Sequence, residues 1–438
     1  MKKTSIFSFD LLLFGATLAL ICIGILFIYS SGITSTGIVF SREFIKQIIW
    51  AGTGLVLMAL VVTVSYARMK GPSIYLYGFC CLILLITPFV GLEVNGARSW
   101  LGIGDVGIQP SEFTKIGTII FLAAYLSGIG AGIKELPRFF LAFAIVLLPM
   151  GLILLQPDLG TALVYIPIFL IMVFMAGARL RHLFYITAAG FLIVILGLLP
   201  FFESKILGRE AGVLSLITHF DLVKYFLAAL LVVGILSAWG YWGLKRRYFY
   251  WILYVSSLLF VSNLGGQAIN RVLKDYQIMR LIVFLKPSLD PQGAGWNIIQ
   301  SITAVGSGGF AGKGFLQGTQ SHYQFLPQQS TDFVFSILAE EWGFLGGLLI
   351  FTLFLIILLR GIRIMYTARD DFSIYIAVGI VGMLFFHVIV NIGMAMGIMP
   401  ITGIPLFFLS YGGSSLWTAL SGIGLLLNIH ARRYRQWS

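Results

Sequence analysis

Apolar runs of about 20 residues recur along almost the whole chain, and no other feature constrains its fold as strongly. A helix of about 20 residues spans the hydrocarbon of a bilayer. Of the 438 residues, 59% are hydrophobic and only 11% are charged, whereas soluble domains carry roughly 25% charged residues. The sequence therefore predicts an all-α polytopic integral membrane protein.

Twelve segments have the length and composition of a spanning helix. They are residues 9–31, 45–66, 73–91, 113–130, 137–155, 158–177, 181–202, 222–240, 248–264, 333–360, 373–397 and 404–429. If a weak segment is re-entrant, ten or eleven spans result. The run 11–29 is longer than a signal-peptide core and lacks a clear small-residue cleavage site, so we expect an uncleaved first helix.

Basic residues predict the orientation of these helices. With the N-terminus inside, the inner loops and both termini hold 17 of the 29 Lys and Arg residues, as the positive-inside rule requires of short loops. This distribution favours an N-in, C-in topology with an even number of spans. It also accounts for the net charge of +12, so we expect no nucleic-acid partner.

Some basic residues fall in outer segments, where the rule disfavours them. They are Arg98, Lys115, Arg271, Lys274, Arg280, Lys286 and Lys313. An anionic ligand at the outer face would explain them; side chains that extend to the membrane interface are the alternative.

Several motif classes are absent from the sequence. The five histidines show no metal-ligand spacing, there is no H-E-x-x-H or G-x-S-x-G motif, and the three cysteines lie inside apolar runs. GSGGFAGKG, residues 306–314, is not a phosphate-binding loop, because Ser307 and Gly314 stand where that motif needs Gly and Ser or Thr. We expect this segment to be a lining that a substrate approaches closely.

Residues 95–116 form an outer loop that leads into a helix start at Pro110. Glu112 and Lys115 are three residues apart and would share one helix face. They form either a local ion pair or a charge pair that lines an outward cavity, and ionisable residues at membrane depth favour the second interpretation.

Two further acidic segments precede apolar runs. In QPDLGT, residues 156–161, we expect Asp158 to cap the next helix. In residues 324–343, we expect Ser330, Thr331 and Asp332 to cap a span. Glu340 and Glu341 then fall about two turns into an apolar helix, so they need partners, or the helix begins above the membrane.

The sequence KPSLDPQGAGW, residues 286–296, isolates one carboxylate, Asp290, between two prolines and two glycines. It belongs to a long outer stretch, 265–332, which also includes a predicted surface helix at 297–305. A loop of this length is usually functional. Asp290 is suited to take a proton from a hydroxyl or to hold a divalent cation, while Gly293 and Gly295 would let a bulky ligand approach. The alternative is an Asx turn that only shapes the loop.

Together these stretches resemble the SEDS family of cell-wall polymerases (shape, elongation, division, sporulation), and its RodA branch more than its FtsW branch. The matching pieces are NGARSWL, IQPSEFTKI, QPDLGT, KDYQIMR, DPQGAGWNIIQS, AVGSGGFAGKGFLQGTQS, FLPQQSTDFVFSILAEEWG and PLFFLSYGGSS. They follow the family order from residue 95 to residue 415.

The chain departs from the family pattern in two places. The family usually has LPE-x-HTDF, where this chain has Gln328 and Ser330 in place of the acid and the histidine. The family also commonly has ten spans, so residues 203–264 are expected to be an insertion with two extra spans inside one polytopic domain, leaving 265–332 as the extracytoplasmic catalytic loop.

The resemblance implies an inverting peptidoglycan glycosyltransferase. Such enzymes polymerise lipid II at the outer face of the cytoplasmic membrane, release undecaprenyl pyrophosphate and serve cell elongation and shape. Asp290 falls on the family's catalytic aspartate, and Mg²⁺ or Mn²⁺ could bind there. The expected substrate-binding residues are Arg98, Trp100, Glu112, Lys115, Lys286, Lys313, Gln320 and Ser321.

The resemblance also implies a partner, a class B penicillin-binding protein with transpeptidase activity. A lipid II flippase is the alternative function, although a transporter should need ionisable residues along its pathway at mid-membrane depth. A non-catalytic scaffold is the third hypothesis, which predicts that Asp290→Asn leaves function intact.

Overall fold

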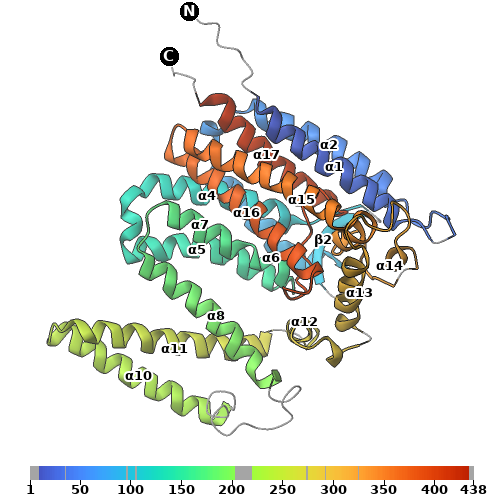
Figure 1. Ribbon diagram of the computed structural model, residues 1–438. Helices are drawn as coiled ribbons and strands as arrows, with labels where there is room; N and C mark the ends of the chain where they lie inside the picture. The colour runs from blue at the N-terminus through green and yellow to red at the C-terminus, as the bar shows by residue number, and fades with distance from the viewer. Residues whose placement is uncertain are drawn as a thin grey trace, which may run out of the picture. The chain divides into compact units, whose positions relative to one another are not determined.

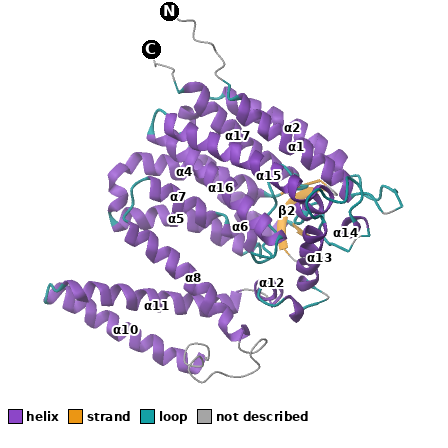
Figure 2. Cartoon of the chain, in the orientation of Figure 1, coloured by secondary structure: helices purple, strands orange, loops and turns teal. Residues whose placement is uncertain are grey.

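The computed structural model describes residues 9–34, 36–94, 97–103, 106–202, 220–272, 275–291, 293–323 and 325–433. The chain forms two compact units. Unit 1 is Met1–Ala178 with Trp296–Ser438, and unit 2 is Arg179–Gly295. Helices dominate both units (Figure 2).

Unit 1 is a bundle of helices (Figure 1). Its helices are α1 (Leu11–Ser31), α2 (Glu43–Thr63), α3 (Ser73–Val90), α4 (Pro110–Ile129), α5 (Leu136–Leu154), α6 (Leu159–Leu163), α7 (Tyr165–Met175), α14 (Thr319–His322), α15 (Val334–Thr367), α16 (Asp371–Ala395) and α17 (Gly413–Arg432), with 3-10 turns η1 (Tyr66–Met69) and η2 (Gly130–Lys134). Helix α13 (Ala294–Ser307) begins just before the boundary between the units. It contains the surface helix predicted at 297–305.

The centre of unit 1 is α16, which packs against α4, α7, α15 and α17. Its most apolar 18-residue stretch is 72% buried, as expected of a helix that is hydrophobic on all sides and enclosed by others. Helices α1 and α2 cover the bundle through α15 and α17 respectively. In Figure 1, α1 begins and α17 ends at the same end of this unit.

A small antiparallel sheet occupies the connection between α3 and α4. Its strands are β1 (Leu92–Val94), β2 (Ala97–Ile103) and β3 (Val106–Ile108), in that order. Leu101 pairs with Ile108 across the second ladder. This sheet could not be predicted from the sequence, because two of its strands have only three residues.

Unit 2 contains α8 (Leu180–Phe202), α10 (Phe220–Gly243), α11 (Arg247–Val272), α12 (Asp275–Val283) and the 3-10 turn η4 (Pro287–Leu289). Helix α11 packs against both α8 and α10, and α12 packs against α8 and η4. The predicted insertion at 203–264 includes α10 and most of α11, while residues 203–219 lie outside the described residues.

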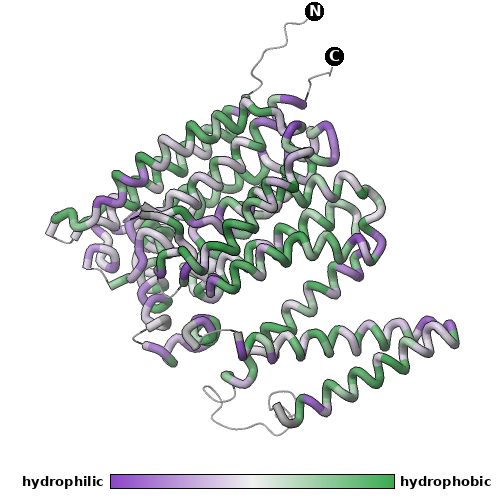
Figure 3. Tube along the Cα trace, turned by 180° about the vertical axis from the view of Figure 1, so that it is seen from behind, coloured by the Kyte–Doolittle hydropathy of each residue, from purple (hydrophilic) through white to green (hydrophobic). Residues whose placement is uncertain are grey.

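Ten helices in the described part of the chain are long and apolar enough to cross a membrane. The apolar segment Leu159–Met175 is shorter. Eleven of the twelve predicted spans coincide with helices, one of them with the pair α6 and α7. The twelfth, 404–429, is helical only from Gly413 onward, in α17. The all-α polytopic class is confirmed. Their exact number in the membrane and their orientation stay predictions. Figure 3 shows apolar residues along the helices and hydrophilic residues concentrated at their ends.

Candidate catalytic and binding site

The motif segments of unit 1 meet at one end of the bundle. Gln109 N–H donates to Ser414 Oγ at 2.9 Å, and Gln109 Nε2 donates to Asp158 Oδ2, also at 2.9 Å. Asp158 Oδ1 accepts from Thr161 N–H at 3.1 Å, which confirms the predicted cap of α6. Three stretches far apart in the sequence are thereby fixed to one another.

Glu112 and Lys115 lie in the first turns of α4 and form a buried ion pair. Lys115 Nζ is 2.7 Å from Glu112 Oε1, with side-chain exposures of 0% and 2%. The ammonium also lies 3.3 Å from His387 Nε2 and over the Phe407 ring. His387 Nδ1 donates to Pro405 O at 2.9 Å, which leaves Nε2 as the acceptor that Lys115 needs.

One atom of this cluster lacks a contact. Glu112 Oε2 is buried and has no hydrogen-bond partner among the described residues. Buried polar atoms in proteins rarely lack a hydrogen-bond partner. The predicted one-face geometry is confirmed, but both side chains are enclosed, so in this structure neither is open to a ligand from outside.

Arg98 and Trp100 lie on strand β2. The Arg98 guanidinium is exposed and lies 3.3 Å from the equally exposed Glu93 carboxylate. Gly107, on the neighbouring strand, packs against the Trp100 ring, because a Cβ there would lie 3.1 Å from a ring carbon. Trp100 therefore packs the sheet with one side of its indole, while Arg98 is available on the surface.

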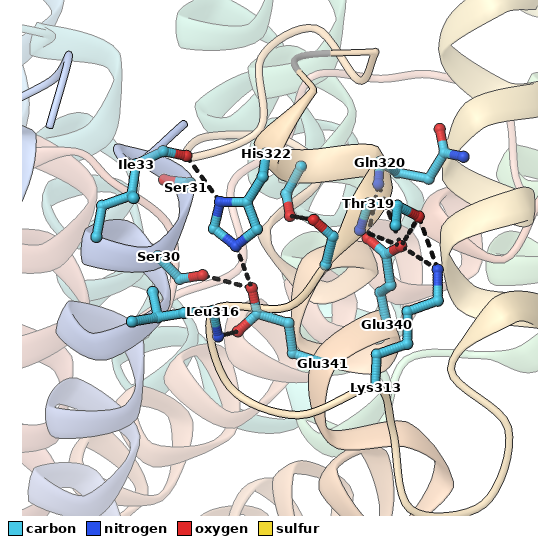
Figure 4. Close-up of polar contacts among 12 residues, drawn as sticks. Ser30, Ser31, Ile33, Lys313, Leu316, Thr319, Gln320, His322, Glu340 and Glu341 are labelled. Atoms are coloured by element: carbon cyan, nitrogen blue, oxygen red, sulfur yellow. Dashed lines mark hydrogen bonds and ion pairs between the residues drawn. The ribbon is translucent and has the colours of Figure 1, made fainter. Parts of the chain in front are cut away.

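Glu340 is the acceptor at the centre of a second cluster (Figure 4). Its Oε1 accepts from Lys313 Nζ at 2.6 Å, from Thr319 N–H at 2.8 Å and from Thr319 Oγ1 at 2.9 Å. Gln320 N–H donates to Oε1 at 3.1 Å and to Oε2 at 3.2 Å. The carboxylate thus holds α14 and the preceding loop against α15.

The neighbouring Glu341 points to the other side, toward α1 (Figure 4). Ser30 Oγ donates to its Oε1, and Leu316 N–H donates to its Oε2 at 3.1 Å. His322 Nε2 lies 3.4 Å from Oε1, an ion-pair distance, while Nδ1 donates to Ile33 O at 2.7 Å. The Glu341 carboxylate raises the pKa of His322, burial opposes that shift, and the Ile33 carbonyl supports it.

Both glutamates therefore have the partners that their sequence position required. The predicted capping of α15 by Ser330, Thr331 or Asp332 is wrong, because the N-cap residue is Phe333 and no side chain caps it. Ser330 instead lies in a preceding turn, where its carbonyl accepts from Tyr411 N–H at 2.7 Å.

Helix α15 is broken immediately after these glutamates, at Gly343, with φ 62° and ψ −155°. In a continuous helix the carbonyls of Glu340 and Glu341 would accept from the N–H groups of Phe344 and Leu345. Here all four groups bond to the glycine-rich segment 306–314. Lys313 and Gly314 N–H donate to the two carbonyls at 3.0 and 2.9 Å, and Phe344 and Leu345 N–H donate to Gly309 O and Phe310 O at 2.9 and 3.2 Å.

The glycines of this segment are needed for contact with α15. A Cβ at Gly308 would lie 1.9 Å from Ala339 O, and one at Gly312 would lie 2.1 Å from Glu341 O. The prediction that these glycines line a substrate is therefore wrong for both positions, because the closely approaching group is the protein's own backbone. Lys313 belongs to the same segment, and its ammonium is held by the Glu340 carboxylate.

Gln320 and Ser321 lie within α14. The Ser321 side chain is buried and donates to Gly318 O at 3.4 Å, so it is enclosed in this structure. Gln320 is partly exposed, and its Oε1 has no hydrogen-bond partner within the described ranges. Of the two predicted substrate contacts, only Gln320 keeps an accessible side chain.

Asp290 and Lys286 belong to unit 2, where they flank the turn η4. Lys286 is exposed and precedes the turn; Asp290 is partly buried and follows it. A Cβ at Gly293 would lie 2.3 Å from Asp290 Oδ2, and one at Gly295 would lie 2.1 Å from Pro287 O. Gly295 is thus required by the backbone of the turn that carries Asp290, which corrects the prediction of a ligand approach there, whereas a side chain at Gly293 would meet only the movable Asp290 carboxylate.

Few of the described side chains are placed to bind a metal ion. The described residues contain no group of three or more His, Cys, Asp or Glu side chains that could hold a metal ion. Mg²⁺ is often bound by one or two carboxylates, water and substrate phosphates. Asp290 alone therefore fits only a cation that takes most of its ligands from water and a diphosphate.

His387 and Gln47 are among the residues of this end of unit 1 that could not be assigned to a site from the sequence. His387 stacks on Phe407 with ring centroids 3.8 Å apart, and Gln47 Nε2 donates to Ser410 O at 3.2 Å. Both are buried. Each is a polar residue inside an apolar run of the sequence, which suggests a buried hydrogen bond. The sequence does not show which group is the partner in that bond.

The fold and these clusters define a polytopic α-helical membrane protein whose polar motif segments contact one another in its larger unit. A family model described as "Cell cycle protein", for FtsW, RodA and SpoVE, matches residues 10–221 and 212–435. The chain belongs to this family.

Individual relatives match along the whole chain. It is 50% identical to the peptidoglycan glycosyltransferase RodA of Treponema pallidum, over 99% of this chain and 100% of the relative. It is 37% identical to stage V sporulation protein E of Bacillus subtilis, over 98% of each chain. A chain from a solved structure described as a peptidoglycan synthase complex that coordinates polymerization and crosslinking matches with TM-score 0.66 and 30% identity, over 98% of this chain and 99% of that one.

Proposed function

We propose that the chain is a peptidoglycan glycosyltransferase that polymerises lipid II into glycan strands. The observation that carries this proposal is the 50% identity, over nearly the whole of both chains, to a protein named for that activity. The site supports it with an aspartate fixed on a short turn, four residues after an exposed lysine.

In the proposed reaction, Asp290 is the general base. Its carboxylate takes the proton of the GlcNAc 4-hydroxyl as that oxygen bonds to the anomeric carbon of a lipid-linked MurNAc. The bond from this carbon to the phosphate oxygen breaks, its electron pair leaves with undecaprenyl pyrophosphate, and the anomeric centre is inverted. A second carboxylic acid is unnecessary, because pyrophosphate leaves without being protonated as an alcohol would have to be.

The leaving diphosphate needs positive charge near Asp290. Lys286 is the exposed cation closest to it in sequence. Mg²⁺ or Mn²⁺ held by Asp290 and the diphosphate would neutralise the developing charge. Lys115 and Lys313 are less suited to this role, because Glu112 and Glu340 already bind their ammonium groups.

The proposed location is the cytoplasmic membrane, with Asp290 on the extracytoplasmic side. The proposed partner is a class B penicillin-binding protein whose transpeptidase crosslinks the new strands. The matched synthase complex, described as coordinating polymerization and crosslinking, supports such an arrangement.

Polymerisation of purified lipid II tests the proposal. Wild type, Asp290→Asn and the control Asp371→Asn, an exposed residue at the start of α16, would be compared with and without the partner and with Mg²⁺ or Mn²⁺. We expect wild type and the control to form strands and Asp290→Asn to be at least about 100-fold slower.

Equal strand formation by Asp290→Asn would remove this residue from the chemistry and favour the scaffold hypothesis if the partner alone also polymerises. No strands from wild type under any condition would contradict the proposal. A lipid II translocation assay would then test the flippase alternative.

A further inference from the structure

A polar cavity of about 330 Å³ lies in unit 1, between the α1–α2 connection and the turn before α15. None of the predicted site residues lines it. Its lining residues are Ser31, Phe40, Ser41, Glu43, Leu326, Pro327, Gln328, Gln329 and Ser330. Both departures from the family pattern, Gln328 and Ser330, are among them.

The strongest hydrogen-bond acceptor in the lining of the cavity is a carboxylate, that of Glu43. The Glu43 carboxylate has no ion-pair partner among the described residues, although it begins α2, where a negative charge is favourable. Gln329 Oε1 also has no hydrogen-bond partner in the described part of the chain, but it is buried, so the cavity does not expose it in this structure. Its orientation is fixed, because Gln329 Nε2 donates to Ser321 O at 3.1 Å.

Hydroxyl and apolar groups complete the lining. Ser31 Oγ donates its proton to Ile28 O at 2.8 Å, so it faces any further ligand as an acceptor. Phe40 is exposed and offers an aromatic ring to a cation. Leu326 is buried and Pro327 is exposed, and both can contact an alkyl chain.

We propose that this cavity binds a primary ammonium group on an alkyl chain. An ammonium has three donors and no acceptor, which complements the Glu43 carboxylate and the Ser31 hydroxyl of the lining. On the proposed function, this ammonium is the free side-chain amine in the peptide stem of lipid II. A free diamine has the same chemistry and is the other source.

The Gln328 position makes the proposal specific to this chain. Gln328 is exposed, has φ 52°, and its Oε1 accepts from Thr331 Oγ1 at 3.2 Å. Glutamate can keep that hydrogen bond and would add a second carboxylate to the cavity. Gln328→Glu should therefore bind an ammonium more tightly, whereas Glu43→Gln should bind it more weakly.

Polymerisation kinetics provide the first test. Lipid II with a lysine-type stem and its Nε-acetylated form would be compared as substrates. We expect acetylation to raise KM about tenfold for wild type, as the loss of a charged hydrogen bond predicts, with little change in kcat. Glu43→Gln should abolish the difference, Gln328→Glu should enlarge it, and the control Glu135→Gln, an exposed glutamate before α5, should keep it.

Direct binding provides the second test and does not depend on catalysis. The soluble lysine-type pentapeptide, its Nε-acetylated form and cadaverine would be titrated against the purified full chain, wild type and Glu43→Gln. Glu43-dependent binding of the free-amine peptide alone supports the stem-peptide source. Equally tight, Glu43-dependent binding of cadaverine supports the ammonium site with a free diamine as its ligand.

Two results would overturn the inference. One is an equal KM of wild type for both substrates together with no Glu43-dependent binding of any amine. The other is a Glu43→Gln variant that discriminates as well as wild type. If no substrate is polymerised but the free-amine peptide still binds through Glu43, the proposed function fails while the ammonium site stands.

Discussion

Unit 1 contains two Lys–Glu pairs with nearly equal N–O distances. They differ in their separation along the chain and in the hydrogen bonds of the carboxylate. Lys115 and Glu112 are 2.7 Å apart, and Lys313 and Glu340 are 2.6 Å apart. The first pair is three residues apart on one helix, whereas the second joins a loop to a helix 27 residues later. Both oxygens of Glu340 accept hydrogen bonds, but Glu112 Oε2 has no partner among the described residues.

This difference separates two roles for a buried carboxylate. A fully satisfied carboxylate fixes the groups that donate to it, so Glu340 holds the glycine-rich segment in place. A buried carboxylate oxygen without a hydrogen-bond partner lowers the stability of the fold, so a purely structural role does not explain its presence. We infer that Glu340 is structural, and we propose that Glu112, although enclosed in this structure, serves the reaction.

Replacing Glu340 should have the largest effect on stability. Glu340→Leu leaves the Lys313 ammonium and the N–H groups of Thr319 and Gln320 without their acceptor. We expect a loss of about 4 kcal/mol in the free energy of unfolding, measured by thermal unfolding in detergent. Glu135→Leu, on the surface, should change it by less than about 0.5 kcal/mol. An equally small effect at Glu340 would show that the cluster does not hold the loop.

Removing Lys115 tests the other pair. Lys115→Met leaves a buried, uncompensated carboxylate and should destabilise the protein by about 3 kcal/mol. The double variant Glu112→Gln, Lys115→Met should recover at least half of that loss, because no charge remains buried.

Glycan synthesis by the double variant decides between the roles. We expect activity to stay lost although stability returns, measured as strands formed per folded molecule. If activity returns with stability, the pair is structural, and the inferred contrast with Glu340 fails.

The break in α15 should respond to a single methyl group. Gly343 has a backbone conformation that only glycine adopts without strain, and a Cβ there would lie 2.3 Å from Gly312 N. Gly343→Ala should cost about 2 kcal/mol in unfolding free energy. Gly347→Ala is the control, since its Cβ would make only an ordinary contact at 3.8 Å. Equal stabilities of the two variants would contradict the described backbone at Gly343.

The smallest effect is a pH dependence from His322. Because the Glu341 carboxylate raises the pKa of His322 above its ordinary value of 6.5, the protonated ring stabilises the fold. This contribution is complete below pH 6.5 and is lost as pH rises through the raised pKa. Wild type should have a higher Tm than His322→Gln at pH 6, and the difference should shrink by pH 9. A difference that is constant over this range would exclude the titration of His322 as its cause.

The sequence predicted the helices well, because apolar runs report membrane burial directly. It also predicted the Asp158 cap and the proximity of Glu112 and Lys115, which depend on local spacing. It could not predict that Ser30 bonds to Glu341, 311 residues away. The role of the glycine-rich segment was predicted wrongly. Its glycines indicate that some group packs closely against this backbone, but the sequence does not show that the group is helix α15 rather than a substrate.

The break at Gly343 separates two tasks within one 34-residue helix. A continuous helix of that length measures about 51 Å, well beyond a hydrocarbon core of about 30 Å. The part after Gly343 is long enough to cross the membrane alone, and the part from Val334 to Trp342 is held by loop hydrogen bonds. The two parts are nevertheless connected, because the carbonyls of Glu340 and Glu341 before the break and the N–H groups of Phe344 and Leu345 after it all bond to residues 309–314. A tilt of the spanning part, such as hydrophobic mismatch imposes on a helix, would therefore be transmitted to the glycine-rich segment and to the Glu340 cluster.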